Sequence, residues 1–306
     1  MTMQIYDLII VGAGPAGITA SVYAARQKLN FLVISLDIGG QAAWSGDIEN
    51  YTGYQFITGP ELAKKFQEHM SKYDIVLKEN ENVIRLKKSG EIILIETNKA
   101  DYRARSVIIA SGKKSKELGV RGEVEFKNRG LTYCATCDGP LFAGKEVAVI
   151  GGGNSALDAA MQLVKIAGHI YIINNTDRLG GDKVARQKVE EADNVTIYNN
   201  SQVLAILGDK FVNAIIIKDK GKEKQLTVGG VFVEIGLIPN SAFAEGLQMN
   251  QNKEIKVTVD NRTNIPGIFA AGDVTDVPEK QIIIAAGEGS KAALSAFRYL
   301  ALKKES

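Results

Sequence analysis

The stretch IYDLIIVGAGPAG occupies residues 5–17. Its first seven residues form a largely apolar, β-branched run that is typical of a buried parallel strand. A helical pattern follows over 18–27, and a second strand is predicted over 30–35. The glycine-rich turn therefore lies in the strand–turn–helix–strand context that the dinucleotide-binding fingerprint requires. This stretch predicts an α/β fold that begins with a nucleotide-binding unit.

Three glycines in this stretch have separate geometric roles. Gly12 allows the tight turn after the strand, Gly14 lets the backbone approach a pyrophosphate, and Gly17 lets the helix pack closely on the strand. The phosphates would lie at the N-terminus of the helix, where free N–H groups and the helix dipole favour anions.

The same plan returns later in the chain. A buried strand over 146–150 leads into GGGNSA at 151–156, followed by a helix over about 156–166 and a strand over 170–173. An internal duplication of this kind indicates two nucleotide-binding units. Shorter strands are predicted over 75–77, 81–87, 92–97, 101–105 and 106–110 in the first copy, and over 195–198, 202–207, 214–218, 225–228 and 231–235 in the second.

A further buried strand over 268–271 ends at Gly272-Asp273, and a last helix is predicted over 286–302. Because the second copy is already complete, we expect this tail to add a strand to the first sheet, with Asp273 at its ligand crevice. The fold is thus predicted as two Rossmann-like three-layer nucleotide-binding domains, the second inserted in the first. The discontinuous domain comprises 1–115 and 244–306, and the inserted domain comprises 116–243.

The only two cysteines of the chain are three positions apart, in CATCDG at 134–139. Such a pair can alternate between a disulfide and a dithiol, which is two-electron chemistry. A structural staple and half a zinc site are the alternatives. Zinc needs about four ligands, and the only histidines, His69 and His169, have no ligand spacing, so no metal is expected. Asp138, directly after Cys137, could exchange a proton with a departing thiolate.

Composition excludes several classes of partner. The net charge is +2 with mixed signs along the chain, which gives no reason to expect nucleic acid or a membrane surface. No apolar run approaches the length of a membrane span. A strand is expected almost at the N-terminus, which leaves no room for a signal peptide. Two cysteines forming one redox pair suit a reducing cytosol, so a cytoplasmic location is predicted.

Together these motifs resemble those of the low-molecular-weight thioredoxin reductases, FAD-dependent pyridine nucleotide-disulfide oxidoreductases of class II. The segments 231–239 and 280–297 are more similar to the flavoprotein subunit of alkyl hydroperoxide reductase, which adds an N-terminal redox domain not present in this sequence. The matching motifs, in family order, are Gly12–Gly17, Gly39-Gly40-Gln41, Glu49-Asn50, Cys134–Gly139, Gly151–Ala156 and Gly272-Asp273.

The resemblance implies FAD in the first domain, a nicotinamide dinucleotide in the second, a homodimer, and a thioredoxin-like or glutaredoxin-like dithiol protein as acceptor. It also implies that Cys137 faces the flavin, that Cys134 is the interchange thiol, and that Asp138 is the acid/base. The implied flavin residues are Gly12, Gly14, Pro15, Ala16, Gly17, Asp37, Gly40, Gln41, Asn50, Val83, Gly112, Gly272, Asp273, Gln281 and Ile282. The implied nicotinamide dinucleotide residues are Gly151, Gly153, Asn154, Ser155 and Asn174.

One departure from the family concerns nucleotide choice. Relatives that use NADPH carry a His-Arg-Arg run where this chain has Asn174-Asn175-Thr176, which provides no charge for a 2′-phosphate. NADH is therefore expected to be favoured over NADPH, without full exclusion of NADPH. Two other functions remain open, a ferredoxin-fed disulfide reductase and a non-enzymatic flavin redox sensor.

The chain crosses between the predicted domains near 113–119 and 236–243. Neither segment has a strong helix or strand pattern, and the basic run at 113–116 is predicted to be a solvated linker. Because the disulfide and the nicotinamide must both reach one flavin, we expect these crossings to serve as hinges for a domain rotation.

Overall fold

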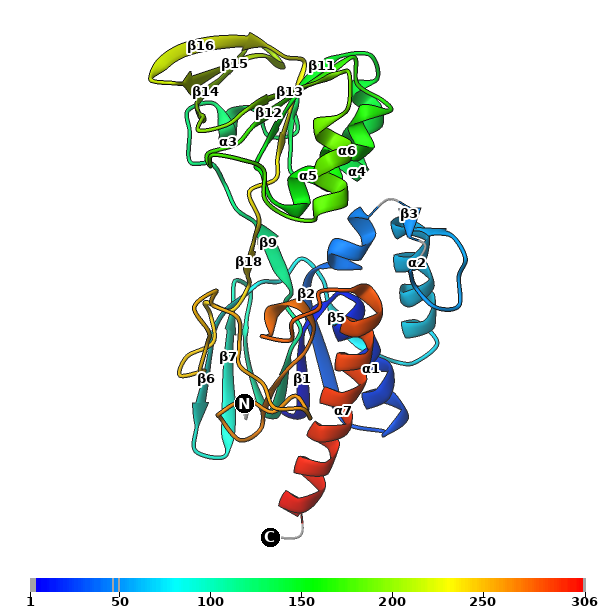
Figure 1. The fold of residues 1–306 in the computed structure, drawn as a ribbon. Helices are drawn as coiled ribbons and strands as arrows, with labels where there is room; N and C mark the ends of the chain where they lie inside the picture. Colours follow the sequence, from blue (N-terminus) through cyan, green and yellow to red (C-terminus); the bar gives the residue numbers. More distant parts are fainter. Residues whose placement is uncertain (1–3, 46, 49, 305–306) are drawn as a thin grey trace. The chain divides into compact units, whose positions relative to one another are not determined.

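The computed structural model describes residues 4–45, 47–48 and 50–304, apart from the side chains of Trp44, Asp47, Thr136, Cys137 and Lys304. The chain divides into two compact units: unit 1, of Met1–Lys114 and Ile238–Ser306, and unit 2, Ser115–Leu237 (Figure 1). Each unit has a sheet with a parallel core and helices packed against it, so the predicted fold class is confirmed.

Unit 1 is built on a seven-stranded sheet. The strands lie in the order β5-β2-β1-β8-β7-β6, and β19 also pairs with β8. The pairs β1–β2, β1–β8, β2–β5 and β8–β19 are parallel, whereas β6–β7 and β7–β8 are antiparallel. The tail therefore returns to the first sheet, as predicted. The strands are β1 (Ile5–Ala13), β2 (Phe31–Ile38), β5 (Val76–Lys78), β6 (Val83–Ser89), β7 (Ile92–Thr97), β8 (Asp101–Ile109) and β19 (Ile268–Ala270).

The prediction of two strands over 101–110 was wrong, because β8 is continuous. Its first half pairs with β7 at Asp101–Ala104, and its second half pairs with β19 at Val107–Ile109. β1 runs along both halves of β8 and joins them into one strand. Buried residues become continuous from Ser106 onward, where the strand beside β8 changes from β7 to β19.

Two alanine-rich helices cover one face of this sheet. In α1 (Pro15–Arg26) and α7 (Ile282–Lys304), small side chains allow the helices to lie side by side (Figure 1). Their buried alanines share one core with Leu8 and Ile10 of β1. Unit 1 also contains η1 (Gly40–Trp44), β3 (Asp47–Ile48), β4 (Ile57–Thr58), α2 (Gly59–Met70) and η3 (Gly272–Val274).

Unit 2 repeats the plan with a smaller parallel sheet, in the order β10-β17-β11-β12-β13. Its strands are β10 (Leu131–Thr132), β11 (Glu146–Ile150), β12 (His169–Ile173), β13 (Val195–Tyr198) and β17 (Gly230–Val233). A separate antiparallel sheet contains β14 (Gln202–Gly208), β15 (Val212–Asp219) and β16 (Lys222–Thr227). The helices are α3 (Glu123–Phe126), α4 (Ala135–Asp138), η2 (Gly139–Phe142), α5 (Asn154–Val164) and α6 (Lys183–Glu190).

The helix α6 was not predicted, although the sequence carries a signal for it. The Asp182 carboxylate accepts hydrogen bonds from the N–H groups of Val184 and Ala185, both at 2.9 Å. Aspartate directly before a helix is a favoured N-cap.

The two chain crossings form strands, contrary to the prediction. β9 (Lys113–Ser115) and β18 (Leu237–Pro239) pair in a two-stranded sheet. The ribbon is extended by hydrogen bonds at either end, from Lys116 N to Gly236 O and from Asn240 N to Gly112 O, both 2.9 Å. Short pairs of this kind carry little period-2 signal in sequence. Among the described residues, no helix combines the length and apolar character that a membrane crossing needs.

Candidate functional site

The glycine turn of unit 1 connects β1 to α1 at close quarters. Gly12 has φ +106°, and a Cβ there would lie 2.3 Å from the Ala110 carbonyl oxygen. A Cβ on Gly17 would lie 1.9 Å from the Gly12 oxygen. Gly14 is the N-cap of α1, and in the described structure no side chain caps this helix. The turn thus presents the start of a helix with free N–H groups to a bound anion.

Loops from two other strands meet this turn. A Cβ on Gly40, after β2, would lie 3.4 Å from the Gly14 Cα. A Cβ on Gly272, after β19, would lie 3.1 Å from the Ala16 Cβ. The carboxyl ends of β1, β2 and β19 therefore converge, as they do at the ligand crevice of a doubly wound sheet. Pro15 is the first residue of α1 and contributes its fixed φ.

Two predicted flavin residues from opposite ends of the chain are in contact. Asn50 Nδ2 donates to Gln281 Oε1 at 3.1 Å, although the residues are 231 positions apart. Ile282, the first residue of α7, packs against the small cluster of Ile48, Ile57 and Leu62. This contact brings the loop after β3 to the N-terminus of α7.

Three predicted flavin residues differ in what they present. Asp37 is exposed, and its backbone carbonyl accepts a bond from Ser35 Oγ at 2.6 Å. The Val83 side chain belongs to the hydrophobic core of unit 1. Gly112 has φ +63° with open space around it. Val83 could therefore serve a ligand through its backbone only.

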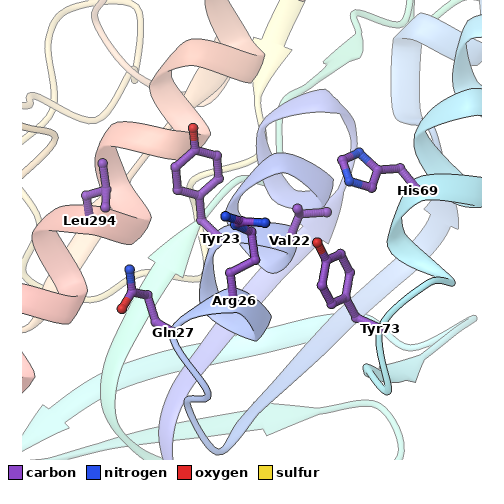
Figure 2. Close-up of a pocket in the computed structure, with 7 residues that line it drawn as sticks. All are labelled: Val22, Tyr23, Arg26, Gln27, His69, Tyr73 and Leu294. Carbon is purple, nitrogen blue, oxygen red and sulfur yellow. The ribbon is translucent and has the colours of Figure 1, made fainter.

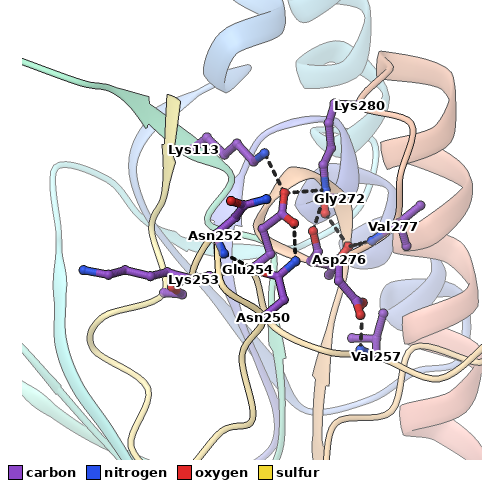
Figure 3. A network of polar contacts seen from close by, with 12 residues as sticks. Lys113, Asn250, Asn252, Lys253, Glu254, Val257, Gly272, Asp276, Val277 and Lys280 are labelled. Atoms are coloured by element: carbon purple, nitrogen blue, oxygen red, sulfur yellow. Dashed lines mark hydrogen bonds and ion pairs between the residues drawn. The ribbon is translucent and has the colours of Figure 1, made fainter. Parts of the chain in front are cut away.

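Beside the crevice lies a buried ion network that sequence reasoning missed (Figure 3). Glu254 Oε1 is 2.9 Å from Lys113 Nζ and 3.2 Å from Lys280 Nζ, and Asn250 Nδ2 donates to Glu254 Oε2 at 2.6 Å. Burial raises the pKa of Glu254, but the bonds from Lys113, Asn250 and Lys280 outweigh it and lower that pKa to about 2. Lys113 is largely buried, so the predicted solvated linker is wrong at this residue.

The charges of this network also act on the carboxyl of Asp273. Burial raises the pKa of the Asp273 carboxyl, and the charges of Lys280 and Lys113 oppose that rise. Gln41 Nε2 donates to the Lys113 backbone carbonyl at 2.9 Å, which ties a further predicted residue to the same place. A lysine placed just before a predicted flavin residue, as in Lys280-Gln281, was the available signal in the sequence.

The glycine turn of unit 2 joins β11 to α5. Gly151 has φ +136°, and a Cβ there would lie 2.2 Å from the Glu234 carbonyl oxygen. Gly153 is the N-cap of α5, with no neighbour within 4 Å of its would-be Cβ. Asn154 Oδ1 accepts a bond from Asp182 N at 2.7 Å, and Ser155 is exposed in the first turn. The described residues fit a second phosphate group here.

Asn174, in contrast, has its side chain engaged inside unit 2. It is 1% exposed, its Nδ2 donates to Asn199 Oδ1 at 2.8 Å, and its Oδ1 accepts from Thr176 Oγ1 at 2.9 Å. A Cβ on Gly152 would lie 2.3 Å from the same Oδ1. Asn174 therefore holds its own loop against the glycine turn.

The cysteine turn lies on the core of unit 2. Cys134 is disulfide-bonded, and Cys137 is the only other cysteine in the sequence. The side chain of Cys137 lies outside the described part of the chain. Asp138 Oδ2 accepts a hydrogen bond from Thr132 Oγ1 at 2.5 Å, and Cys134 N donates to Thr132 Oγ1 at 3.1 Å.

A second carboxyl, from Glu234 at the end of β17, also reaches this turn. Burial raises the pKa of Glu234 to about 8, opposed by a hydrogen bond from the Ala135 N–H, with a small further rise from the Asp158 charge. Sequence analysis missed Glu234. An acidic residue directly after four buried apolar residues was the signal.

A surface pocket of about 430 Å³ lies elsewhere on unit 1 (Figure 2). It contains none of the predicted site residues. Its lining comes from α1, the end of α2 and α7, namely Val22, Tyr23, Arg26, Gln27, His69, Tyr73 and Leu294.

Two glycine turns with uncapped helix N-termini, and a disulfide-bonded cysteine turn, define a dinucleotide-dependent disulfide oxidoreductase as the class. The family model for pyridine nucleotide-disulphide oxidoreductases matches residues 6–289, and the chain belongs to this family.

Curated relatives and solved structures agree with that membership. A Bacillus subtilis protein named NADH dehydrogenase is 42% identical over 298 residues, covering 96% of this chain and 58% of the relative. An alkyl hydroperoxide reductase component from Xanthomonas campestris pv. phaseoli is 41% identical over 304 residues, covering 97% and 57%. The chain thus spans less than three fifths of these relatives. The crystal structure of Lactococcus lactis thioredoxin reductase matches with TM-score 0.85 and 34% identity, covering 97% of this chain and 99% of that one.

Proposed function

We propose that this protein is a flavoenzyme that passes electrons from NAD(P)H through FAD and the Cys134–Cys137 pair to the disulfide of a thioredoxin-like or glutaredoxin-like protein. One observation carries the proposal. The disulfide-bonded Cys134 lies on a turn whose neighbour Ala135 belongs to the same buried core as Ala156 and Leu157 of α5. A disulfide sulfur and a helix that follows a glycine-rich turn are therefore parts of one unit, which supports a redox role for the pair.

The two units divide the work in this proposal. Unit 1 holds FAD, with the pyrophosphate on the turn from Gly12 to Gly17, and unit 2 holds the nicotinamide dinucleotide on the turn from Gly151 to Ala156. When bound, FAD would accept a hydride from the nicotinamide and pass an electron pair on to the disulfide. Asn50 and Gln281 lie together where the flavin ring is expected. Homodimerisation and a cytoplasmic location accompany the proposal.

The protein residues act on sulfur and on protons. The Cys134 thiolate attacks the partner disulfide, one partner sulfur leaves as a thiolate, and a mixed disulfide forms. The Cys137 thiolate then attacks the Cys134 sulfur, which re-forms the internal disulfide and releases the second partner thiolate. Each released thiolate takes one proton, and Asp138 is the group that supplies it at this turn, taking up a new proton from solvent between the two releases. The sum is NAD(P)H, a proton and a partner disulfide in, and NAD(P)⁺ and a partner dithiol out.

NADH is the favoured donor in this proposal. Near the end of β12, Asn174 is buried and bonded within its own loop, so it presents no charge to a 2′-phosphate. The Arg186 guanidinium donates to the Leu179 carbonyl at 3.4 Å and lies 3.9 Å from Glu190. We expect a higher kcat/KM for NADH than for NADPH, and a strong preference for NADPH would contradict this assignment.

The test uses the FAD-loaded protein and the variants Cys134→Ser and Cys137→Ser. Under anaerobic conditions NADH should bleach the flavin absorbance in the wild type and in both variants, because neither cysteine is needed for flavin reduction. Reduction of an acceptor protein should fall in both variants by at least about 10³-fold, since the sulfur route is interrupted. Wild-type acceptor rates in both variants would disprove the route through the pair.

The same experiment separates the other candidates. A ferredoxin-fed reductase would leave the flavin oxidised with either nucleotide, yet would reduce the acceptor with reduced ferredoxin. A non-enzymatic sensor would bind FAD and turn over no acceptor with any donor. The open Gly153 and the uncapped start of α5 favour the nucleotide-fed enzyme over both. The relatives named as parts of alkyl hydroperoxide reductase add a peroxide-reducing partner to the panel of acceptors.

A further inference from the structure

The hydroxyl of Thr132 joins two parts of the cysteine turn. Thr132 is 6% exposed and ends strand β10. Its Oγ1 accepts the Cys134 N–H at 3.1 Å and donates to Asp138 Oδ2 at 2.5 Å. A hydroxyl has one hydrogen, and a backbone N–H can only donate, so the hydrogen of Thr132 is free for the carboxylate.

The position of Thr132 is set by the sheet to which it belongs. Thr132 is opposite Phe232 in the parallel pair of β10 with β17. Asp138 is tied a second time, because its backbone N–H donates to the Cys134 carbonyl at 3.2 Å. One oxygen of the Asp138 carboxyl is therefore bonded to the last residue of β10, and the Asp138 backbone N–H is bonded to the cysteine itself.

We propose that Thr132 is a positioning residue for the acid/base step at the cysteine turn. It holds Asp138 Oδ2 and leaves the other carboxyl oxygen to carry the exchangeable proton. When the carboxyl gives that proton to a departing thiolate it becomes a carboxylate, and a hydrogen bond from Thr132 stabilises the charged form. This role rests on the proposed function of Asp138.

The hydroxyl is the only part of Thr132 that the proposal needs. Thr132→Val keeps the shape and burial but removes both hydrogen bonds. Thr132→Ser keeps the hydroxyl and loses one methyl group. Asp138→Asn removes the proton carrier, so in that background the hydroxyl of Thr132 has nothing left to position. The wild type, Thr132→Val, Asp138→Asn and the double variant form a thermodynamic cycle. Thr132→Ser tests whether retaining the hydroxyl restores the wild-type behaviour.

The measurement is the single-turnover rate at which each dithiol-reduced, FAD-loaded protein reduces the disulfide of a thioredoxin. Thr132→Val should slow this step by about 10- to 100-fold, because acid/base catalysis of this kind contributes about 10²–10⁴-fold. Thr132→Ser should remain within about threefold of the wild type. In the Asp138→Asn background, Thr132→Val should change the rate less than about twofold.

A second readout needs no acceptor. Alkylation of the reduced protein by iodoacetamide at one fixed pH should slow in Thr132→Val and stay unchanged in Thr132→Ser. If the proposed function failed, the wild type would reduce no acceptor, and the alkylation difference would still test Thr132. Equal effects of Thr132→Val with and without Asp138 would mean a purely structural role and would overturn the proposal. So would wild-type rates in Thr132→Val. Flavin content and the thermal unfolding midpoint verify that each variant is folded.

Discussion

The two glycine turns look alike in sequence but are packed differently. In unit 1 the third motif position is Gly17, and a Cβ there would lie 1.9 Å from the Gly12 carbonyl oxygen. In unit 2 the same position is Ala156, which carries a Cβ and is 1% exposed. The helix of unit 2 therefore has room for one carbon more than the helix of unit 1. The same sequence motif is thus compatible with tighter and looser packing of the helix on the strand, and the neighbouring backbone decides which packing occurs.

A second difference concerns buried carboxyls near the strand ends. In unit 1, Glu254 lies between Lys113 and Lys280, and its pKa is lowered to about 2. In unit 2, burial raises the pKa of Glu234 to about 8, and the one hydrogen bond that opposes burial comes from a neutral N–H. Burial with two lysine partners thus favours the charged form of glutamate in unit 1, and burial without a cation favours the neutral form in unit 2.

The largest effect is expected from changing the third glycine. Gly17→Ala should destabilise unit 1 by at least about 4 kcal/mol, because the added carbon overlaps a backbone oxygen that cannot move without shifting α1. Flavin should be lost with the fold. Thermal unfolding followed by flavin release measures both effects. The matched change in unit 2, Ala156→Gly, should cost only about 1 kcal/mol, which is the ordinary penalty of glycine in a helix. Equal losses in the two variants would mean that the packing difference has no energetic meaning.

The next effect comes from Glu254. Glu254→Gln leaves two partly buried lysines without their anion, and the pKa difference from 4.5 to about 2, at about 1.4 kcal/mol per pH unit, gives roughly 3 kcal/mol. Because the folded pKa is lowered, this stability is present above about pH 4.5 and is lost as the pH falls toward 2. Denaturant unfolding at pH 7 and at pH 3 should therefore show a large difference between variant and wild type at pH 7 and a smaller one at pH 3.

The control for Glu254 is an exposed ion pair of the same unit. Glu245 pairs with Arg85 at the surface, and Glu245→Gln should change stability by less than about 1 kcal/mol. A Glu254→Gln protein as stable as the wild type at pH 7 would remove the ion network from the account of unit 1.

Glu234 should give the opposite sign and the smallest change. Its folded pKa is raised, so the wild type loses stability as the pH rises from about 4.5 to about 8. Glu234→Gln keeps an oxygen for the Ala135 N–H and cannot ionise, so it should already be more stable than the wild type at pH 6 by about 2 kcal/mol, at about 1.4 kcal/mol per pH unit above 4.5. The two proteins should converge near pH 4. Denaturant unfolding across pH 4–8 measures this, with the exposed Glu223→Gln as control, and a variant less stable at pH 8 would refute it.

Much of the fold could be predicted because buried strands carry their own signal. The runs at 92–97, 146–150 and 195–198 were predicted to the residue, and the tail strand of unit 1 follows from its apolar pattern and its position after a complete second unit. The strands β9 and β18 were missed because their pairing depends on where the two crossings meet in space, and three residues contain no period.

The sequence could predict parts of the candidate site where the chemistry needs a fixed residue type. Glycines at turns and the paired cysteines meet that condition. The lysines around Glu254 do not, because their charges are brought together from β9 and the loop before α7 and are far apart in sequence. Asn174 shows that a predicted ligand residue can instead be bonded within the protein. The resemblance placed Asn174 among the nicotinamide dinucleotide residues, yet its side-chain amide is bonded to Thr176 and Asn199, and no local sequence pattern predicts those bonds.

The parallel pairing of β19 with β8 also affects how the protein is made. Val107 of β8 pairs with Ile268, which is synthesised 161 residues later. At about 5–20 residues per second, a ribosome needs roughly 10–30 s to supply it. During that interval the nascent chain carries an open, apolar strand edge, which is a template for wrong pairing. Unit 2 emerges whole within the same interval, so it can fold while the unit that surrounds it in sequence is still incomplete.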